Sequence, residues 1–243
     1  MISKDIATTA MVLAAGLGKR MRPITDTMPK PLVKIAGKTL LDRGLDSLAD
    51  VGVEKAVVNV HYFPEQIAAH VLRRRAPTVL ISDESERLLD SAGGIAKALP
   101  ELGPQPFYIV NADTFWIDRG EPNLLRLART WDAEKMDILL MLADPGSATG
   151  HSGGTDFLLK PDGRLSRSAG APQGLIYAGA AIVSPHIFAK AKPEPHSLNV
   201  YFDRAIGADR LYGMRMEGHW ITVGTPEAIA PAEAVIAAAV ADA

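Results

Sequence analysis

Short apolar runs alternate with helical patterns along the first two-thirds of the chain. The runs are rich in Val, Ile and Leu and are bounded by polar or turn-forming residues, as is typical of strands buried on both faces. They occupy residues 11–15, 56–60, 107–113 and 137–142, with a weaker example at residues 78–82. We therefore predict that these segments form the strands of one sheet.

The segments between the runs have the period of amphipathic helices. In residues 38–52 leucines recur at spacings of four and three, and Gly52 provides a C-terminal stop. Residues 64–75 begin with Pro64, which suits a first helical turn, and we expect the three arginines at their end to be solvated. Strands that alternate with helices of this length favour right-handed crossovers. The pattern predicts an α/β fold with a Rossmann-like, mostly parallel sheet.

The pattern changes in the last third of the chain. Residues 155–168 contain two short apolar segments around a Pro-Asp-Gly turn, which indicates a β-hairpin. A further strand is expected at residues 174–184, a short helix at 184–188 and a late strand pair or extended segment at 214–224. The closing segment, residues 226–243, is an alanine-rich helix that we expect Pro231 to kink or split. These elements predict a β-rich insertion in the α/β fold.

No internal repeat, low-complexity linker or composition change marks a second domain. We expect a flexible lead-in over residues 1–10 and a single domain over residues 11–243. The 243 residues suffice for a substantial core, with 47% hydrophobic and 22% charged residues. No apolar run approaches the ~20 residues of a membrane span, so no membrane association is expected.

Charge and cysteine content narrow the class of protein further. A formal net charge of −2 gives no reason to expect nucleic-acid binding. The absence of cysteine excludes disulfides, thiolate zinc sites and thiol catalysis, and it fits a cytoplasmic protein. Any basic binding site must therefore be local.

One such local site follows the first predicted strand, in LAAGLGKRMRPITDTMPKPL at residues 13–32. Gly16 and Gly18 would let backbone N–H groups approach a ligand. Arg20 suits bidentate contact with phosphate oxygens, and Lys30, stiffened by a proline on each side, acts as a point charge. The loop is interpreted as a phosphate site, against the alternative of a solvated basic turn.

Two common phosphate-binding motifs do not fit this loop. The dinucleotide fingerprint requires a third glycine where Met21 stands, and Pro23 interrupts the helix that should follow. The P-loop pattern, which ends in Gly-Lys-Ser/Thr, is absent. What remains is a glycine-rich anion-binding turn.

Asp113 ends the predicted strand at residues 107–113. Ligands of open parallel sheets bind outside the carboxyl ends of the strands, so a carboxylate here is well placed to hold Mg²⁺ against phosphates. A helix N-cap or a turn would also explain an isolated Ala-Asp pair; the nearby basic loop favours the metal. Asn111 lies on the same side of the strand and is a candidate contact to the nucleotide.

The segments LAAGLGKRMRP and PKPL together resemble the signature of the sugar-1-phosphate nucleotidyltransferases. The resemblance extends over nearly the whole chain: LLDSAGGIAKALPEL is similar to the glycine-rich segment that holds the nucleobase, FYIVNADTFW to the strand that ends in the metal aspartate, and GHWITVGTPE to a late W-x-D-x-G-T segment. In its compact length and in the absence of an E-K-P motif, the sequence most resembles the N-acetylmuramate-1-phosphate uridylyltransferases of cell-wall recycling.

This resemblance implies a GT-A-like domain, with Mg²⁺ as cofactor, that transfers a nucleotidyl group from a nucleoside triphosphate such as UTP to a sugar 1-phosphate, releasing pyrophosphate. The implied catalytic residues are Arg20, Lys30 and Asp113, and Asp113 is the metal ligand. The implied nucleotide-binding residues are Leu13, Ala14, Ala15, Gly16, Gly18, Lys19, Arg20, Ala92, Gly93 and Asn111. Glu84 or Ser85 would complete the base pocket.

The β-rich insertion would hold the sugar, and its candidate contacts are Gly154, Asp156, Tyr177 and Gly179. Each of these residues is also compatible with turn chemistry or strand packing. The expected partners are a nucleoside triphosphate and a sugar 1-phosphate, in a monomer or small homo-oligomer. Guanylyl or cytidylyl transfer to mannose phosphate, heptose phosphate or phosphocholine is the same-class alternative.

One position departs from the family pattern. Thr222 stands where W-x-D-x-G-T supplies a second metal-binding aspartate, and a neutral hydroxyl is a weaker Mg²⁺ ligand. Three outcomes follow: Asp113, phosphates and water hold the metal alone; Asp203 or Asp209 substitutes; or the protein binds nucleotide sugars with little turnover.

Overall fold

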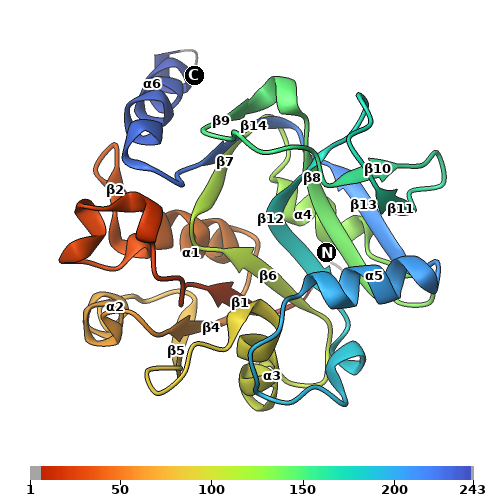
Figure 1. Ribbon diagram of the computed structural model, residues 1–243, viewed down its shortest axis with the longest axis horizontal. Coiled ribbons are helices and arrows are strands. Elements are labelled where there is room, and N and C mark those ends of the chain that lie inside the picture. The colour runs from red at the N-terminus through yellow and green to blue at the C-terminus, as the bar shows by residue number, and fades with distance from the viewer. Residues whose placement is uncertain (1–6, 242–243) are drawn as a thin grey trace.

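The computed structural model describes residues 7–241 and places a twisted seven-stranded sheet at the centre of the molecule, in the strand order β13-β8-β12-β6-β1-β4-β5 (Figure 1). Its strands are β1 (Thr9–Leu13), β4 (Lys55–Val60), β5 (Thr78–Asp83), β6 (Phe107–Asn111), β8 (Ile138–Ala143), β12 (Ile176–Val183) and β13 (Leu211–Arg215). All neighbouring strands are parallel except β12, which runs antiparallel to both β6 and β8. The predicted mostly parallel α/β sheet is confirmed.

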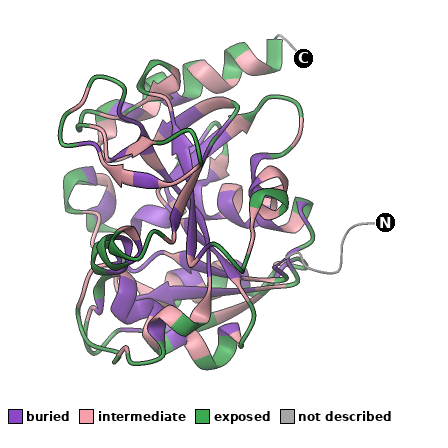
Figure 2. Ribbon diagram, turned by 90° about the vertical axis from the view of Figure 1, so that its right-hand side faces the viewer, coloured by how far each residue is buried: buried purple, intermediate pink, exposed green. Residues whose placement is uncertain are grey.

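Helices cover both faces of this sheet. They are α1 (Leu40–Asp50), α2 (Pro64–Val71), α3 (Asp90–Leu102), α4 (Asn123–Thr130), α5 (Asn199–Gly207) and α6 (Ile229–Ala241). Buried side chains of α1, α2 and α4 pack with one face of the sheet, and those of α3 and α5 with the other. Figure 2 shows the buried residues concentrated along the central strands. None of the helices in the described part of the chain has the length and apolar character needed to cross a membrane.

Three smaller sheets are attached to this core. β7 (Thr114–Asp118), β14 (Gly218–Thr222) and β9 (Ala148–Thr149) form one, β10 (Phe157–Leu159) and β11 (Leu165–Arg167) form the predicted hairpin, and β2 (Lys34–Ile35) and β3 (Lys38–Thr39) form the third. A separate apolar cluster packs the segment around β2 against β7, β14 and α6. This cluster includes Met21 and Val33, which belong to the region of the basic loop.

Several predicted boundaries and pairings are corrected by the structure. β1 begins at Thr9, so the end of the expected lead-in belongs to the sheet, while residues 1–6 lie outside the described part of the chain. The segment expected as a late strand pair or extended segment forms two strands that do not pair with each other, because β13 joins the main sheet and β14 pairs with β7. α6 continues unbroken through Pro231, which lies in its first turn, where a missing backbone N–H costs little.

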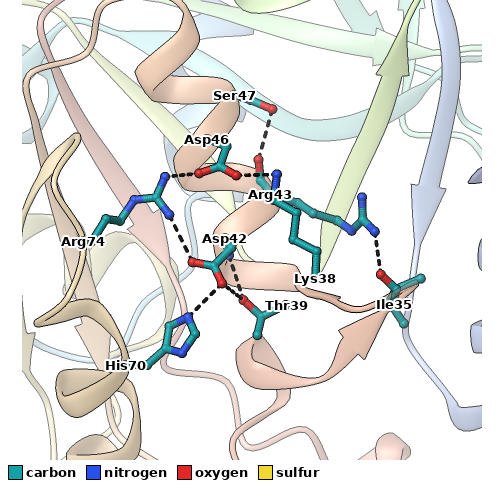
Figure 3. A network of polar contacts seen from close by, with 9 residues as sticks. All are labelled: Ile35, Lys38, Thr39, Asp42, Arg43, Asp46, Ser47, His70 and Arg74. Atoms are coloured by element: carbon teal, nitrogen blue, oxygen red, sulfur yellow. Dashed lines mark hydrogen bonds and ion pairs between the residues drawn. The ribbon is translucent and has the colours of Figure 1, made fainter.

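The predicted helix over residues 64–75 is too long, because α2 ends at Val71. Arg74, expected to be solvated, instead lies against α1, with its side chain 13% exposed, and pairs with Asp42 and Asp46 (Figure 3). Arg73 and Arg75 are exposed, as predicted. The arginine run therefore contains one structural residue between two solvated ones.

Candidate active site

The carboxyl ends of three neighbouring strands bring polar groups to one edge of the sheet. Leu13, the last residue of β1, is in register with Asn59 on β4 and with Asn111 on β6. The basic loop leaves β1 at this edge, and Asp113 follows β6 at the same edge. The arrangement is the one expected of a ligand site in an open α/β sheet.

Gly18 sets the shape of the loop after β1. Its φ of 60° lies in the left-handed region, and a Cβ atom added there would lie 3.0 Å from Thr25 Cγ2 and 3.1 Å from Lys30 Cβ. Gly16, in contrast, has open space where a side chain would stand. Gly18 is therefore required by backbone conformation and close packing, and Gly16 leaves the backbone accessible from the cavity side.

Lys30 and Asp113 form an ion pair across this edge. Lys30 begins a 3₁₀ turn, Lys30–Leu32, and is 8% exposed. Its Nζ atom lies 2.8 Å from Asp113 Oδ2, and the Asp113 side chain is 40% exposed. The sequence places these two residues 83 positions apart, and the fold brings them into contact. The predicted proximity of the basic loop and the strand-end carboxylate is thus observed.

Arg20 lies on the outer side of the same loop. It is exposed, and its guanidinium Nη2 lies 3.5 Å from the point where a Cβ atom on Gly224 would stand. The neighbouring Val223 donates its backbone N–H to the Asp113 carbonyl oxygen at 3.1 Å. The basic loop, the turn that holds Asp113 and the segment after β14 therefore meet at one place.

A cavity of about 500 Å³ opens at this junction. Its lining residues are Leu13, Ala14, Ala15, Gly16, Lys30, Pro31, Asn59, Leu88, Asp90, Ser91, Asn111, Ala112, Asp113 and Pro195. Seven of the predicted site residues are among them: Leu13, Ala14, Ala15, Gly16, Lys30, Asn111 and Asp113. Gly18, Lys19 and Arg20 lie on the loop beside the cavity, outside this lining.

A buried polar chain connects the loop after β1 with the start of α3. The Ala14 amide donates to Asn59 Oδ1 at 2.7 Å, and Asn59 Nδ2 donates to Glu84 Oε1 at 2.8 Å. Glu84, 2% exposed, also accepts the Leu89 amide at 3.0 Å. A Cβ atom on Gly94 would fall 2.6 Å from Glu84 Oε1, so this glycine admits the carboxylate.

Glu84 and Ser85, expected to complete the base pocket, both lie outside the cavity lining. Glu84 is buried and links Asn59 to Leu89, while Ser85 bonds to Asp83. Sequence reasoning missed Asn59, although a polar residue near the end of an otherwise apolar strand is a signal that could have identified it.

The start of α3 is covered by the segment Glu194–Leu198. The amides of Ala92 and Gly93 donate to the His196 carbonyl oxygen at 3.0 and 3.4 Å, and the Leu198 amide donates to Ser91 Oγ at 2.8 Å. A Cβ atom on Gly93 would lie 2.2 Å from the Glu194 carbonyl oxygen. These two predicted nucleotide contacts thus face the covering segment in this structure.

The cavity side of α3 is provided by its neighbours. Leu88, Asp90 and Ser91 line the cavity together with Pro195 of the covering segment. Asp90 has a φ of 59°, an uncommon conformation for a residue with a side chain, and it is found here at the cavity wall. No local pattern in the sequence indicates Pro195, because its position depends on how residues 194–198 pack on α3.

The four predicted sugar contacts lie outside the cavity lining. Asp156 Oδ2 accepts the Tyr177 amide at 2.8 Å, which ties the hairpin region to the start of β12. Gly179, with φ 78°, lies at an irregularity in the β12–β8 pairing, and a Cβ atom there would meet Thr114 Oγ1 at 2.6 Å. Gly154 is exposed, and its carbonyl oxygen contacts His151 Nε2.

Tyr177 carries a buried hydroxyl that has no hydrogen-bond partner within residues 7–241. Burial raises the pKa of Tyr177 well above its ordinary value, and the nearby Asp156 charge adds to this effect. The phenol therefore stays neutral at any physiological pH and retains a free donor.

Thr222 ends β14 opposite Thr114, directly before the Val223 amide that bonds to Asp113. The residues suggested as substitutes are engaged elsewhere: Asp203 pairs with Arg167 at 2.8 Å, and Asp209 pairs with Arg164 at 3.2 Å, both at the β10–β11 hairpin. The described residues contain no group of three or more acidic, His or Cys side chains able to hold a metal ion. Asp203 and Asp209 thus have arginine partners at the hairpin, and neither lines the cavity.

Comparison with known proteins agrees with this geometry. The model of the MobA-like NTP transferase domain matches residues 10–156. Over 235 residues, 95% of this chain and 97% of that protein, the sequence is 43% identical to N-acetylmuramate alpha-1-phosphate uridylyltransferase of Caulobacter vibrioides. The protein of the same name from Neisseria meningitidis is 34% identical over 232 residues, 94% of this chain and 98% of that protein.

The fold also matches a solved structure. The inositol-1-phosphate CTP transferase from T. maritima superposes with a TM-score of 0.78 over 95% of both chains, at 18% identity. At this identity the likeness concerns the fold alone, and it includes the GT-A-like arrangement predicted from the sequence.

Proposed function

This chain belongs to the MobA-like NTP transferase family, and from that membership we propose that it transfers the uridylyl group of UTP to N-acetylmuramate 1-phosphate, giving a UDP-sugar and pyrophosphate. Two relatives with this activity in their names match almost the whole chain. The observation that carries the proposal is the Lys30–Asp113 pair in a cavity at the carboxyl ends of β1, β4 and β6.

The chemistry requires in-line attack of a sugar phosphate oxygen on the α-phosphorus of the triphosphate. Such a reaction depends on positioning and on neutralising charge more than on an acid–base pair. The accessible backbone from Leu13 to Gly18 supports a role in cradling the triphosphate. Arg20, exposed at the rim, would bind its outer phosphates, and Lys30 would offset negative charge near the α-phosphate.

Asp113 is the proposed ligand for Mg²⁺. Its side chain is exposed to the cavity, and Mg²⁺ typically takes one or two protein carboxylates together with substrate phosphates, so the residues present fit the ion. When bound, the ion would supply Lewis-acid stabilisation of the phosphoryl oxygens. Thr222 leaves Asp113 as the one carboxylate proposed for this role.

We propose that different groups of residues bind the base and the sugar. Leu88, Asp90 and Ser91 offer an apolar contact and short polar groups for the base, with Ala92 and Gly93 behind them. We propose that Gly154, Asp156, Tyr177 and Gly179, which lie outside the cavity lining at the start of β12 and in the hairpin region, belong to the sugar site.

The remaining features of the proposal follow from charge and architecture. The near-neutral net charge and the absence of a helix able to span a membrane within the described residues support a cytoplasmic enzyme that binds neither nucleic acid nor membranes. We propose that residues 11–243 act as one domain, as a monomer or small homo-oligomer.

A matrix of nucleoside triphosphates against phosphorylated acceptors tests the proposal. Pyrophosphate release should be fastest with UTP and N-acetylmuramate 1-phosphate, and Asp113→Asn should remove it. The matrix includes GTP with mannose or heptose 1-phosphate and CTP with phosphocholine, because these are the same-class alternatives. Turnover with GTP or CTP alone would refute the uridylyl assignment.

A further inference from the structure

Lys30 and Asp113 neutralise each other in the nucleotide-free protein. The ammonium occupies one carboxylate oxygen of Asp113 at 2.8 Å and has no other hydrogen-bond partner among residues 7–241. Lys30 is buried, whereas the Asp113 side chain is open to the cavity. The group proposed to bind phosphate and the group proposed to bind the cation therefore hold each other until ligands arrive.

This pairing sets the charge that an approaching ligand meets. The formal charges of Lys30 and Asp113 sum to zero, and the neighbouring Thr222 adds none. A divalent cation at Asp113 would lie next to the Lys30 ammonium and be repelled by it in a partly buried setting, where screening by water is weak. A triphosphate would attract the same ammonium.

We propose that Lys30 guards the cation site: it blocks Asp113 in the nucleotide-free protein and releases it when a triphosphate draws the ammonium away. Cation and triphosphate then bind as one cooperative unit. The inference rests on the proposed function, since it assumes that this cavity receives both ligands, and it adds a rule for the order in which they are accepted.

The local structure confines this exchange to a side chain. Pro29 and Pro31 fix the backbone around Lys30, and the Val33 amide donates to the Lys30 carbonyl oxygen at 3.0 Å. A lysine side chain has a flexible four-carbon stem and three rotatable donors, so its ammonium can change partners without backbone motion. Lys30 and Asp113 both line the cavity, which places both partners within reach of the same ligand.

The first test measures cation binding without nucleotide. Mn²⁺ binding is followed by electron paramagnetic resonance in the wild type, in Lys30→Met and in Lys34→Met, a matched loss of one exposed lysine from β2. Since repulsion between like charges at contact distance is only weakly screened in a partly buried site, Lys30→Met should bind Mn²⁺ at least about tenfold more tightly. Lys34→Met should stay within about twofold of the wild type, because distant exposed charges are screened.

Equal Mn²⁺ affinity in the wild type and Lys30→Met, or no binding by Lys30→Met, would overturn the inference. Thermal unfolding of both variants establishes that they are folded. Should Lys30→Met fail to fold, the wild type still provides a test, because Mn²⁺ affinity must rise when UTP is present, and it must rise beyond the affinity of UTP itself for the ion.

The second test removes the charge of Asp113 and measures nucleotide binding. With EDTA present, Asp113→Asn should bind UTP about tenfold more tightly than the wild type, because the ammonium is no longer held by a carboxylate. Removing a negative charge favours an anion in any case, so the same substitution is repeated in Lys30→Met. The gain should be clearly smaller in that background; an equal gain would show that the two residues act independently.

These readouts separate the two proposals. Turnover with UTP together with a Lys30-independent Mn²⁺ affinity would leave the proposed function standing and remove the guard. Absence of turnover in the whole substrate matrix would remove the proposed function, whatever the Mn²⁺ result.

Discussion

Two groups of charged residues in this molecule differ in the number of donors that each carboxylate receives. Between α1 and α2, Asp42 receives Arg74 at 3.0 Å, His70 at 2.9 Å and the Thr39 hydroxyl at 2.7 Å, while Asp46 pairs with Lys38 and Arg74 (Figure 3). At the cavity, the Asp113 carboxylate receives Lys30 alone among the described residues.

The difference separates structural from functional charge. The α1–α2 network, defined as Lys38, Thr39, Asp42, Asp46, His70 and Arg74, has several donors for each carboxylate and joins two helices that follow one another in the chain. The Lys30–Asp113 pair leaves carboxylate oxygens and ammonium protons open toward a cavity. A carboxylate that several donors hold resists exchange of its partners, whereas a carboxylate with a single donor can accept a ligand.

The largest expected effect comes from removing the Lys30 charge. Lys30→Met should lower kcat/KM by about 10²–10³-fold, the range seen when one preorganised electrostatic contact to a transition state is lost. The melting temperature should change little, because Asp113 remains partly hydrated. Initial-rate kinetics and calorimetry measure the two quantities. A loss of stability without a loss of rate would show that Lys30 is a structural residue and not a functional one.

The cavity wall offers the next effect. In Gly93→Ala the new methyl group would lie 2.2 Å from the Glu194 carbonyl oxygen, so residues 194–196 must shift and carry Pro195 with them. We expect UTP binding to weaken by about 10–100-fold, since displacement of a site wall by about 1 Å has effects of this size. Isothermal titration with UTP checks it. Gly207→Ala, where an added Cβ meets nothing within 4 Å, is the control and should bind normally.

The α1–α2 network should respond in stability alone. Arg74→Met removes the shared partner of Asp42 and Asp46 and should lower the free energy of unfolding by about 1–2 kcal/mol, with kcat/KM nearly unchanged. Arg73→Met is the matched control in the same run, because Arg73 is exposed. Urea denaturation measures both; equal effects of the two substitutions would contradict the structural role of Arg74.

The smallest expected effect is the loss at low pH of the stabilisation that Asp46 provides. Burial opposes ionisation of Asp46, yet hydrogen bonds from Lys38 and Arg74 outweigh it and hold the pKa of the Asp46 carboxyl below its ordinary value. The stabilisation is therefore complete above the unfolded pKa of about 3.9 and is lost as pH falls through the lower folded pKa.

Because Asp46 is partly exposed, we expect a contribution of only a few tenths of a kcal/mol. The difference in unfolding free energy between wild type and Asp46→Asn should be present at pH 7 and shrink toward zero near pH 2. A difference that is the same at both pH values would show that the carboxyl acts by packing and not by its charge.

The sequence predicts the part of the site that local pattern and strand direction determine. Asp113 lies at the end of an apolar run and Lys30 in a proline-stiffened loop, and the rule that parallel strands end at one edge suffices to expect them together. The role of Gly18 can likewise be predicted, because two glycines directly after a strand indicate a tight turn with an uncommon backbone conformation.

The remaining features depend on contacts between distant segments. The sequence around Glu84 does not indicate whether its side chain lines a pocket or bonds to Asn59, because this depends on how α3 packs. Ala92 and Gly93 look like exposed helix-start residues until residues 194–198 are placed over them. Arg74 differs from Arg73 and Arg75 only because α2 ends early and directs one of three identical side chains toward α1.

The direction of β12 has a consequence for how such proteins diversify. Because β12 is antiparallel to β8, the long excursion over residues 144–175 leaves and re-enters the sheet at one place, where Ile176 is paired with Ala143. Lengthening a loop whose ends are already joined costs only the logarithm of its length in entropy. The segment that we propose to bind the acceptor can therefore change in length at this junction while β1, β4 and β6 stay in place.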